Sequence, residues 1–475
     1  MALRPRSTGR NWRQSISLNL WTALVQVATP VLVLRLWLRA RREPGYGMVW
    51  GERWGLSNDP RPTATSRTVW LHAVSLGETH ACVPLMQAWI AQDPDVRFLL
   101  THMTATGRAA GSEICARAEF VGRVTQAWLP YDTPGAVRRF LRNHRPSLGV
   151  LMETEVWPNL IAGCSTLSVP LALANARLSP RSLRRAQRIR WLIEPALASL
   201  AAIVAQTPGD AQRLRSLGVE DALVAGNLKF DRLLDSAQSL RGQHWREALQ
   251  GRRVILAAST REGEEADLLA AVADDRAGRV GGGPRPLLVM VPRHPQRFDE
   301  VADQILARGF RLVRRAHCPA LGAMPGVVAG AMPTGEGADW TQTDVLLGDS
   351  MGEMAAWYAL ADVAILGGSL RAFGGQNLIE AAALGCPVVL GEHTFNFAQA
   401  ADDAVERGAA LRAADAGQAL ALARDICDDP QRRASMSLLA LDWVAAHRGA
   451  AQRTLRALAC LLPDGPVSPG DPSRA

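Results

Sequence analysis

The sequence predicts an α/β protein in which two doubly wound domains follow an apolar N-terminal helix. Short apolar runs alternate with amphipathic stretches along most of the 475 residues, which is the pattern of parallel strands joined by helices. The alternation stops at residues 232–251 and then restarts, so two sheets are expected. The length exceeds that of one ordinary domain, and an apolar share of 48% is enough for more than one core.

The N-terminal segment suits a membrane. Residues 14–34 carry no charge and would extend about 31 Å as a helix, close to the hydrocarbon thickness of a bilayer. Three tryptophans suit an interfacial belt: Trp12, Trp21 and Trp37. Three residues weaken the apolar pattern: Asn19, Gln26 and Pro30. A single span and a helix lying in the interface both stay open. A signal peptide fits less well, because no small-residue cleavage site precedes the arginine-rich run at 35–42.

The formal charge of +8 belongs to this arm. Residues 1–44 hold eight Arg and one Glu, whereas the rest of the chain is nearly neutral. A nucleic-acid-binding protein usually carries its excess charge on a folded face, so no nucleic-acid partner is expected. A basic arm beside apolar sequence indicates anionic lipid headgroups instead. Arginines flank both ends of the apolar segment, so they do not orient it across a membrane.

Cysteine and histidine usage indicates a reducing compartment and no metal. The seven cysteines are odd in number and form no CxxC pair, which is typical of mostly buried thiols. The nine histidines lack metal-ligand spacing, so no zinc site is expected.

The strands expected in the first half are Val69–Val74, Phe98–Thr101, Leu148–Met152, Leu171–Asn175, Ile203–Gln206 and Leu223–Ala225. Helical patterns lie between them, for example at 181–200 and 209–217. The strands expected in the second half are Val254–Ala258, Leu287–Val291, Phe310–Val313, Val345–Leu347, Val363–Leu366 and Val388–Leu390. Ligands of such sheets bind at the carboxyl ends of the strands. Two such domains facing each other would place an active site in the cleft between them.

The first strand leads through His72-Ala-Val-Ser-Leu-Gly to Glu78, which precedes an apolar-periodic helix. The positive end of the helix dipole lowers the pKa of a carboxyl group there, whereas burial or a neighbouring anion raises it. Such a carboxylate can act as general base on an acceptor hydroxyl. Glu78 can equally serve as a helix cap, and the local sequence leaves both roles open.

Two carboxylates, Glu153 and Glu155, follow the strand that ends at Met152. Carboxylates directly after a buried strand are costly unless they are paired or functional, and the sequence does not choose between these two. Arg177 ends the next strand and could pair with either. Lys229 is the only lysine among 53 basic residues and lies at a strand end near the domain boundary. A compact cation there can stabilise a departing phosphate or a sugar carboxylate, although chance also explains one lysine in an arginine-rich chain.

Three strand-to-helix junctions in the second half suit phosphate binding: Val291–Arg297, Asp349–Glu353 and Gly367–Glu380. Backbone N–H groups at helix starts bind phosphate oxygens, and Arg293 can add a charge-assisted bond. Gly374 and Gly375 permit close backbone approach. In the run that begins at Asn377, Glu380 lies one turn into the helix, where it could accept from ribose hydroxyls.

Taken in order, these motifs closely resemble those of the 3-deoxy-D-manno-octulosonic acid (Kdo) transferases of lipopolysaccharide synthesis. The resemblance runs from the apolar N-terminus to near residue 400. The matching segments are 51–55, 72–78, 129–132, 152–159, 174–179, 228–231, 291–298, 348–353, 367–369 and 393–397. Related enzymes often carry Gly-Gly-His-Asn-Pro-Leu-Glu where this chain has Gly-Gly-Gln-Asn-Leu-Ile-Glu. Gln376 therefore replaces a histidine.

The resemblance implies a GT-B fold with two Rossmann-like domains facing a cleft. It implies inverting transfer of Kdo from CMP-Kdo to the tetraacylated lipid A precursor (lipid IVA), at the cytoplasmic face of the bacterial inner membrane. Neither a metal nor a cofactor beyond the donor is implied. Glu78 would be the general base, and Glu153 and Lys229 the transition-state stabilisers. CMP would contact Pro292, Arg293, Met351, Gly352, Glu353, Asn377, Leu378, Ile379 and Glu380.

The predicted organisation has five parts. A membrane anchor with a basic arm (1–44) precedes an acceptor domain (45–235), a linker (236–251), a nucleotide-sugar domain (252–462) and a disordered tail (463–475). Residues 281–284 and 319–340 are expected to be surface loops.

Two other functions fit part of the pattern. A sugar-nucleotide epimerase has a similar two-domain architecture, but it would not explain the anchor and would convert the donor alone. A lipid-binding scaffold with an inactive transferase fold would not explain the intact Glu78, Lys229 and Glu380, and it would not bind CMP. The sequence does not fix the number of sugars added or the oligomeric state.

Overall fold

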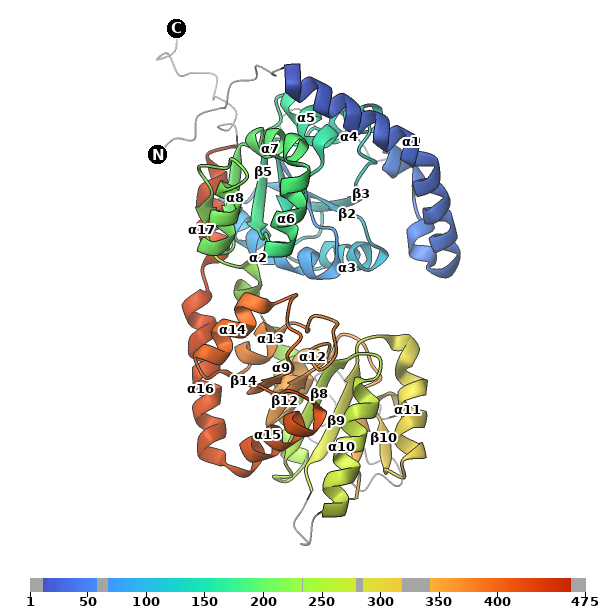
Figure 1. Cartoon of the computed structure of the whole chain (residues 1–475), viewed down its shortest axis with the longest axis vertical. Helices are drawn as coiled ribbons and strands as arrows, with labels where there is room; N and C mark the ends of the chain where they lie inside the picture. The colour runs from blue at the N-terminus through green and yellow to red at the C-terminus, as the bar shows by residue number, and fades with distance from the viewer. Residues whose placement is uncertain (1–11, 58–66, 233, 279–284, 318–341, 463–475) are drawn as a thin grey trace. The chain divides into compact units, whose positions relative to one another are not determined.

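The computed structural model describes residues 12–57, 67–232, 234–278, 285–317 and 342–462. The chain divides into two compact units. The first contains Met1–Arg232 and Arg448–Ala475, and the second contains Leu233–His447. Each unit is a parallel sheet with helices packed around it (Figure 1). The predicted fold class of two doubly wound α/β domains is therefore confirmed.

The sheet of the first unit has seven parallel strands in the order β3-β2-β1-β4-β5-β6-β7. Their bounds are β1 Thr68–His72, β2 Arg97–His102, β3 Val124–Trp128, β4 Leu148–Met152, β5 Leu171–Ala176, β6 Ala202–Ala205 and β7 Leu223–Val224. The helices are α2 Leu76–Gln92, α3 Ala105–Cys115, α4 Pro134–His144, α5 Pro158–Thr166, α6 Pro180–Arg188, α7 Arg190–Ala198 and α8 Pro208–Arg215. The strand order reverses between β1 and β4, the position where doubly wound sheets bind ligands.

Both faces of this sheet are covered, which explains why its central strands read as continuous apolar runs. Val69 and Leu71 of β1 belong to one hydrophobic cluster, whereas Trp70 between them belongs to the cluster on the opposite face. This alternation is the two-residue period of a strand. Such burial fixes the register of β1 and with it the place where the chain leaves the sheet.

The sheet of the second unit is also seven-stranded and parallel, in the order β10-β11-β9-β8-β12-β13-β14. Its strands are β8 Val254–Thr260, β9 Leu287–Pro292, β10 Leu312–Arg314, β11 Val345–Leu347, β12 Val363–Leu366, β13 Val388–Leu390 and β14 Ala410–Arg412. Its helices are α9 Ser236–Ala248, α10 Glu264–Gly278, α11 Phe298–Ala307, α12 Met354–Leu360, α13 Leu378–Ala383, α14 Ala398–Glu406, α15 Ala416–Asp428 and α16 Pro430–His447. The strand order reverses between β8 and β12.

All twelve expected strands are present, with ends shifted by at most two residues. Two strands were missed, β3 and β14, which lie at sheet edges and contain polar or half-exposed residues. The helix expected at 181–200 is divided at Ile189 into α6 and α7. Residues 281–284, the loop at 319–340 and the tail at 463–475 lie outside the described residues.

The domain boundaries differ from the predicted ones at two places. The residues of the expected linker form α9, which packs against α12, with the rings of Trp245 and Trp357 4.7 Å apart. The chain also returns to the first unit at its C-terminal end. There α17, Ala450–Ala459, packs against α2. Both Asp231 carboxylate oxygens accept backbone N–H bonds at the start of α17, from Gly449 at 2.6 Å and from Ala451 at 2.5 Å.

The N-terminal helix α1, Trp12–Arg42, packs against α5 and α7 of the first unit. Pro30 lies inside it, and the helix bends along its length (Figure 1), as proline kinks predict. Within the described residues, its part Ser15–Arg42 is long and apolar enough to cross a membrane by length and composition.

Candidate active site

The N-terminus of α2 lies beside the point where the strand order of the first sheet reverses. β1 pairs with β4, so Glu78 after β1 and Glu153 after β4 leave neighbouring strands at the same sheet edge. Glu78 is the third residue of α2. Its carboxylate accepts the Val74 backbone N–H at 3.0 Å and the Ser75 hydroxyl at 2.9 Å. These two bonds tie Glu78 to the residues just before α2. They do not form a capping box, because neither donor is a backbone N–H of the N-cap or the first turn and the Ser75 side chain makes no cap bond. The expected helix-cap role is therefore not observed.

The same position raises the pKa of Glu78 from its usual 4.5 to about 7. Burial is the largest cause, the negative charge of Glu153 is the second, and Glu155 adds a smaller contribution. The hydrogen bonds from Val74 and Ser75 oppose the shift, because they favour the charged form. A carboxyl group with such a pKa can both accept and release a proton near neutral pH. The hydrogen bonds that hold the loop before α2 and a role in proton transfer are thus compatible in one residue.

Glu153 and Lys229 form an ion pair, with Nζ 2.8 Å from Oε1 and both side chains largely buried. The backbone of Glu153 has a φ of 57°, a left-handed conformation that non-glycine residues adopt at a cost and that is common at functional sites. Glu155 has a different partner, because its Oε2 accepts the Trp157 indole N–H at 2.8 Å. The structure therefore separates the two carboxylates that the sequence could not distinguish.

Lys229 is held in place by two asparagines that the sequence analysis did not single out. The Asn227 side chain accepts the Lys229 backbone N–H at 3.0 Å. The buried Asn175 side chain accepts the Leu228 N–H at 3.1 Å. Asn175 also has a positive φ, 51°, which asparagine tolerates better than most residues. An asparagine at a strand end was the available signal. Arg177 donates its backbone N–H to the Glu153 carbonyl, and its expected side-chain pairing stays a prediction.

In the second unit, Arg293 follows β9 and Glu380 lies in α13. Both act on the hydroxyl of the buried Tyr358. Burial raises the pKa of that hydroxyl most, Glu380 raises it further, and Arg293 opposes the shift. The charges of Arg293 and Glu380 therefore both influence the pKa of this phenol. Asn377 caps α13 by accepting the Ile379 N–H at 3.2 Å, and Leu378 and Ile379 are buried. Pro292 ends β9 beside Thr260.

The junction after β11 carries Met351, Gly352 and Glu353. Met351 is exposed, and Gly352 has a φ of 80° that suits glycine. The Glu353 carboxylate pairs with Arg315 at 2.8 Å and with Arg241 at 3.2 Å. The Glu353 side chain is thus occupied by these two arginines and stabilises the loop.

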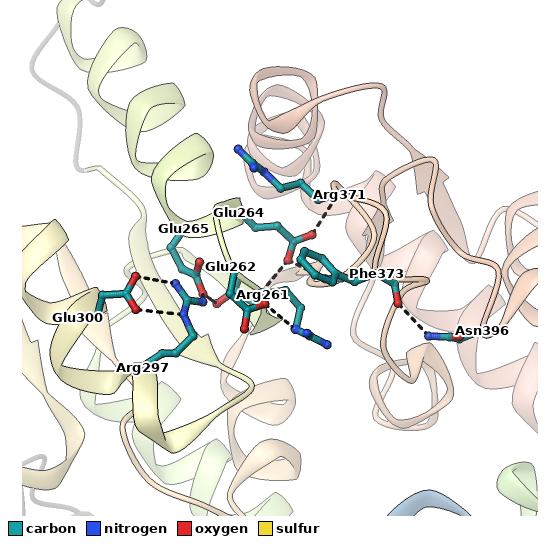
Figure 2. Close-up of polar contacts among 11 residues, drawn as sticks. Arg261, Glu262, Glu264, Glu265, Arg297, Glu300, Arg371, Phe373 and Asn396 are labelled. Carbon is teal, nitrogen blue, oxygen red and sulfur yellow. Dashed lines mark hydrogen bonds and ion pairs between the residues drawn. The ribbon is translucent and has the colours of Figure 1, made fainter. Parts of the chain in front are cut away.

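The buried Glu264 connects the loop after β8 with the loop after β12 (Figure 2). Its carboxylate accepts four backbone N–H groups, two of them close: Gly368 at 2.7 Å and Arg261 at 2.9 Å. The N–H groups of Leu370 and Arg371 complete the set. Glu264 thus occupies the N–H groups of Gly368, Leu370 and Arg371, whereas phosphate binding at the start of α13 stays a prediction.

Gly374 is also explained by protein contacts. A Cβ atom there would lie 2.5 Å from both Phe395 and Asn396. The Asn396 amide, in turn, donates to the Phe373 carbonyl at 3.1 Å (Figure 2).

The described residues contain no group of three or more His, Cys, Asp or Glu side chains arranged to hold a metal ion. Glu78, Glu153 and Lys229 come together in the first unit, and the residues expected to contact CMP lie at the carboxyl edge of the second sheet. The cleft between the two domains stays a prediction.

Comparisons with known proteins agree with these motifs. A family model described as 3-deoxy-D-manno-octulosonic-acid transferase (kdotransferase) matches residues 48–232. The 3-deoxy-D-manno-octulosonic acid transferase of Bordetella pertussis is 47% identical over 92% of this chain and 98% of its own length. That of Haemophilus influenzae is 31% identical over 92% and 96%. The crystal structure of the Neisseria meningitidis UDP-GlcNAc 2-epimerase matches 82% of this chain and 99% of its own, with a TM-score of 0.55 and 11% identity. The last similarity concerns the fold alone.

Proposed function

Since the chain belongs to the 3-deoxy-D-manno-octulosonic acid (Kdo) transferase family and is therefore a glycosyltransferase, we propose that its donor is CMP-Kdo and its acceptor the tetraacylated lipid A precursor. The observation that carries the catalytic part is the grouping of Glu78 with the Glu153–Lys229 pair. The acceptor is an amphiphile, which agrees with an apolar N-terminal helix. We place the reaction at the cytoplasmic face of the bacterial inner membrane.

The proposed reaction is a single displacement with inversion at the anomeric carbon. An acceptor hydroxyl oxygen forms the new bond to that carbon while the bond to the CMP phosphate breaks, and CMP leaves with the bonding electrons. Glu78 takes the hydroxyl proton. Its pKa of about 7 supports this role, because proton transfer is most efficient when the pKa lies near the working pH.

Lys229 supplies positive charge where the leaving phosphate or the sugar carboxylate becomes more negative. Glu153 keeps that cation in a fixed position 2.8 Å away and raises the pKa of Glu78. One carboxylate would thus serve both the base and the electrostatic stabiliser.

The CMP part of the donor is assigned to the edge of the second sheet. Arg293 offers a charged donor for the phosphate, and Glu380, in the first turn of α13, could accept from the ribose hydroxyls. The exposed residues Met351 and Gly352 can contact the nucleotide through their backbone. The Glu353 side chain would act by shaping this loop, since two arginines hold it.

The direct test is incubation of the purified full chain with CMP-Kdo and the lipid A precursor, followed by mass measurement of the lipid. The expected product is heavier by one or more Kdo units, and the mass also gives the number of additions. Conversion of the donor in the absence of acceptor would favour an epimerase. Absence of CMP binding would favour an inactive scaffold.

A further inference from the structure

The two faces of α1 are both apolar, but only one of them meets protein. Seven exposed apolar residues recur every three or four positions and form one stripe: Ile16, Leu20, Leu24, Val27, Val31, Leu34 and Leu38. The half-buried residues fall between them at the same spacing: Leu18, Thr22, Val25, Thr29, Val33, Leu36 and Ala40. With 3.6 residues per turn, the two sets lie on opposite sides of the helix.

The inner face is fixed to the first unit by specific polar contacts. The Trp21 indole N–H donates to Asp132 Oδ2 at 2.7 Å, and the Thr22 hydroxyl donates to Asn159 Oδ1 at 2.8 Å. Asp132 is buried and also accepts the backbone N–H groups of Asn159 and Leu160 at the start of α5. Asp132 and Asn159 belong to two of the sequence motifs, yet neither has a part in the proposed chemistry.

These contacts conflict with a helix that crosses a bilayer. Trp21 and Thr22 lie inside the segment that would occupy the hydrocarbon. A span would either carry Asp132 and the start of α5 into lipid, where a carboxylate without water is costly, or break both hydrogen bonds. A helix lying flat keeps them and leaves only the outer stripe facing away from the protein.

The outer face also has the charge that an anionic leaflet attracts. Four exposed arginines end or follow the stripe: Arg35, Arg39, Arg41 and Arg42. Among the described ion pairs, one involves this set, Arg39 with Glu43. Helix α6 carries four more exposed arginines, Arg181, Arg184, Arg185 and Arg188, and precedes α7, which packs against α1. Basic residues beside an apolar helical face are typical of interfacial helices.

We propose that α1 lies in the plane of the membrane interface, held between the first unit and an anionic lipid leaflet, and does not cross the bilayer. This inference refines the membrane association included in the proposed function. It also explains why the segment looks like a span in the sequence: one apolar face packs on protein and the other on lipid, and exposed polar residues such as Asn19 and Gln26 are few.

The depth of the helix is the decisive measurement. Spin labels are attached to full-length Leu20→Cys, Val27→Cys and Leu34→Cys variants, in a background where Cys115, Cys318 and Cys460 are replaced by serine. The other cysteines are buried. The probe is vesicles of phosphatidylethanolamine and phosphatidylglycerol. All three labels are expected within about 10 Å of the headgroups. A Val27 label near the bilayer centre, about 15 Å deep, would overturn the proposal.

A second experiment tests the stripe itself. Leu24→Asp with Val27→Asp is expected to lower the partition of the full chain into these vesicles at least about tenfold, because the variant loses apolar burial and places charge against lipid. Leu438→Asp on α16 is the matched control, since Leu438 is 64% exposed and Leu24 61%, and its partition should not change. Equal loss in both variants would contradict the proposal. So would a stripe that mediates dimers without affecting vesicle binding.

The two proposals fail separately. Vesicle binding and label depth involve no Kdo, so they report on α1 even where no transfer is detected. The variant with Leu24→Asp and Val27→Asp should have the same thermal midpoint as the unchanged chain. It should also transfer Kdo to detergent-dispersed acceptor at the same rate, because Leu24 and Val27 lie outside the catalytic machinery.

Discussion

At the residue scale, Glu78 shows how one side chain serves the fold and the proposed chemistry together. Its oxygens accept two hydrogen bonds from the residues just before α2, which hold this loop and favour the charged carboxylate. Burial and Glu153 favour the neutral form more strongly, and the pKa rises to about 7. Glu153 follows β4 and is distant from Glu78 in the sequence, which is why the local sequence left the role of Glu78 open.

This balance predicts the pH dependence of transfer. The reaction needs ionised Glu78, so kcat/KM should rise with pH through an apparent pKa of about 7. Stability should change in the opposite direction. The folded-state pKa is raised from 4.5, so this contribution to folding is complete below pH 4.5 and is lost as pH rises through 7. A pH–rate profile and unfolding midpoints at several pH values check both trends.

Glu153 and Glu155 allow a controlled test of which charge raises the pKa of Glu78. Glu153→Gln removes the second-largest cause and should move the inflection of the pH–rate profile to lower pH, whatever its effect on the maximal rate. Glu155→Gln removes the smallest cause and should move it less. An equal displacement in the two variants would show that Glu153 is not the dominant charged neighbour of Glu78.

The charge of Lys229 should matter more than its packing. Lys229→Met leaves Glu153 without its cation and should reduce kcat by about 100-fold or more, in the range of lost electrostatic stabilisers. Lys229→Arg should recover only part of this loss, because a planar guanidinium cannot replace a compact ammonium 2.8 Å from Glu153. Steady-state kinetics check the order of the three proteins. Full activity in Lys229→Met would remove this residue from the mechanism.

At the element scale, Glu264 joins the ends of β8 and β12. Glu264→Ala would leave four backbone N–H groups without their acceptor and should destabilise the second unit by about 3 kcal/mol or more. Chemical denaturation and CMP binding by calorimetry measure the two consequences. Glu262→Gln is the control, because Glu262 is exposed and pairs with the neighbouring Arg261. A normal midpoint in Glu264→Ala would refute this role.

The contacts of α1 can be tested on the same scale. Thr22→Val breaks a hydrogen bond to Asn159, whereas Thr29→Val breaks only one to Val25 within α1. Combined with Trp21→Phe, Thr22→Val should detach the inner face and raise amide hydrogen exchange across α1, with a loss of about 1–3 kcal/mol. Thr29→Val should leave exchange nearly unchanged. Equal protection in all variants would mean that these contacts do not hold the helix.

The elements also show where sequence patterns succeed and fail. Buried parallel strands such as β4 and β11 were predicted to the residue, because continuous apolar runs have few alternatives. The edge strands β3 and β14 were missed, because solvent reaches them and their apolar pattern weakens. Glu264 was missed because three of its four backbone partners lie 104 to 107 residues away along the chain, which no local pattern records.

At the scale of the whole molecule, the two-domain plan followed from the repeated alternation of strands and helices. The domain boundary could not be predicted in the same way, because the sequence of α17 looks like a continuation of the helices that precede it. Its apolar residues enter the first core together with α2. The carboxylate of Asp231, two residues after Lys229, accepts hydrogen bonds from backbone N–H groups at the N-terminus of α17. The C-terminal helix thus stabilises the loop that carries the proposed stabiliser.

The return of α17 to the first unit has a consequence for biosynthesis. The first unit is interrupted by the second unit, Leu233–His447, so its core stays incomplete until α17 leaves the ribosome. At bacterial translation speeds this delay is on the order of tens of seconds, during which the apolar surface of α2 awaits its partner. A premature stop codon just before α17 would therefore damage the half of the protein that is made first.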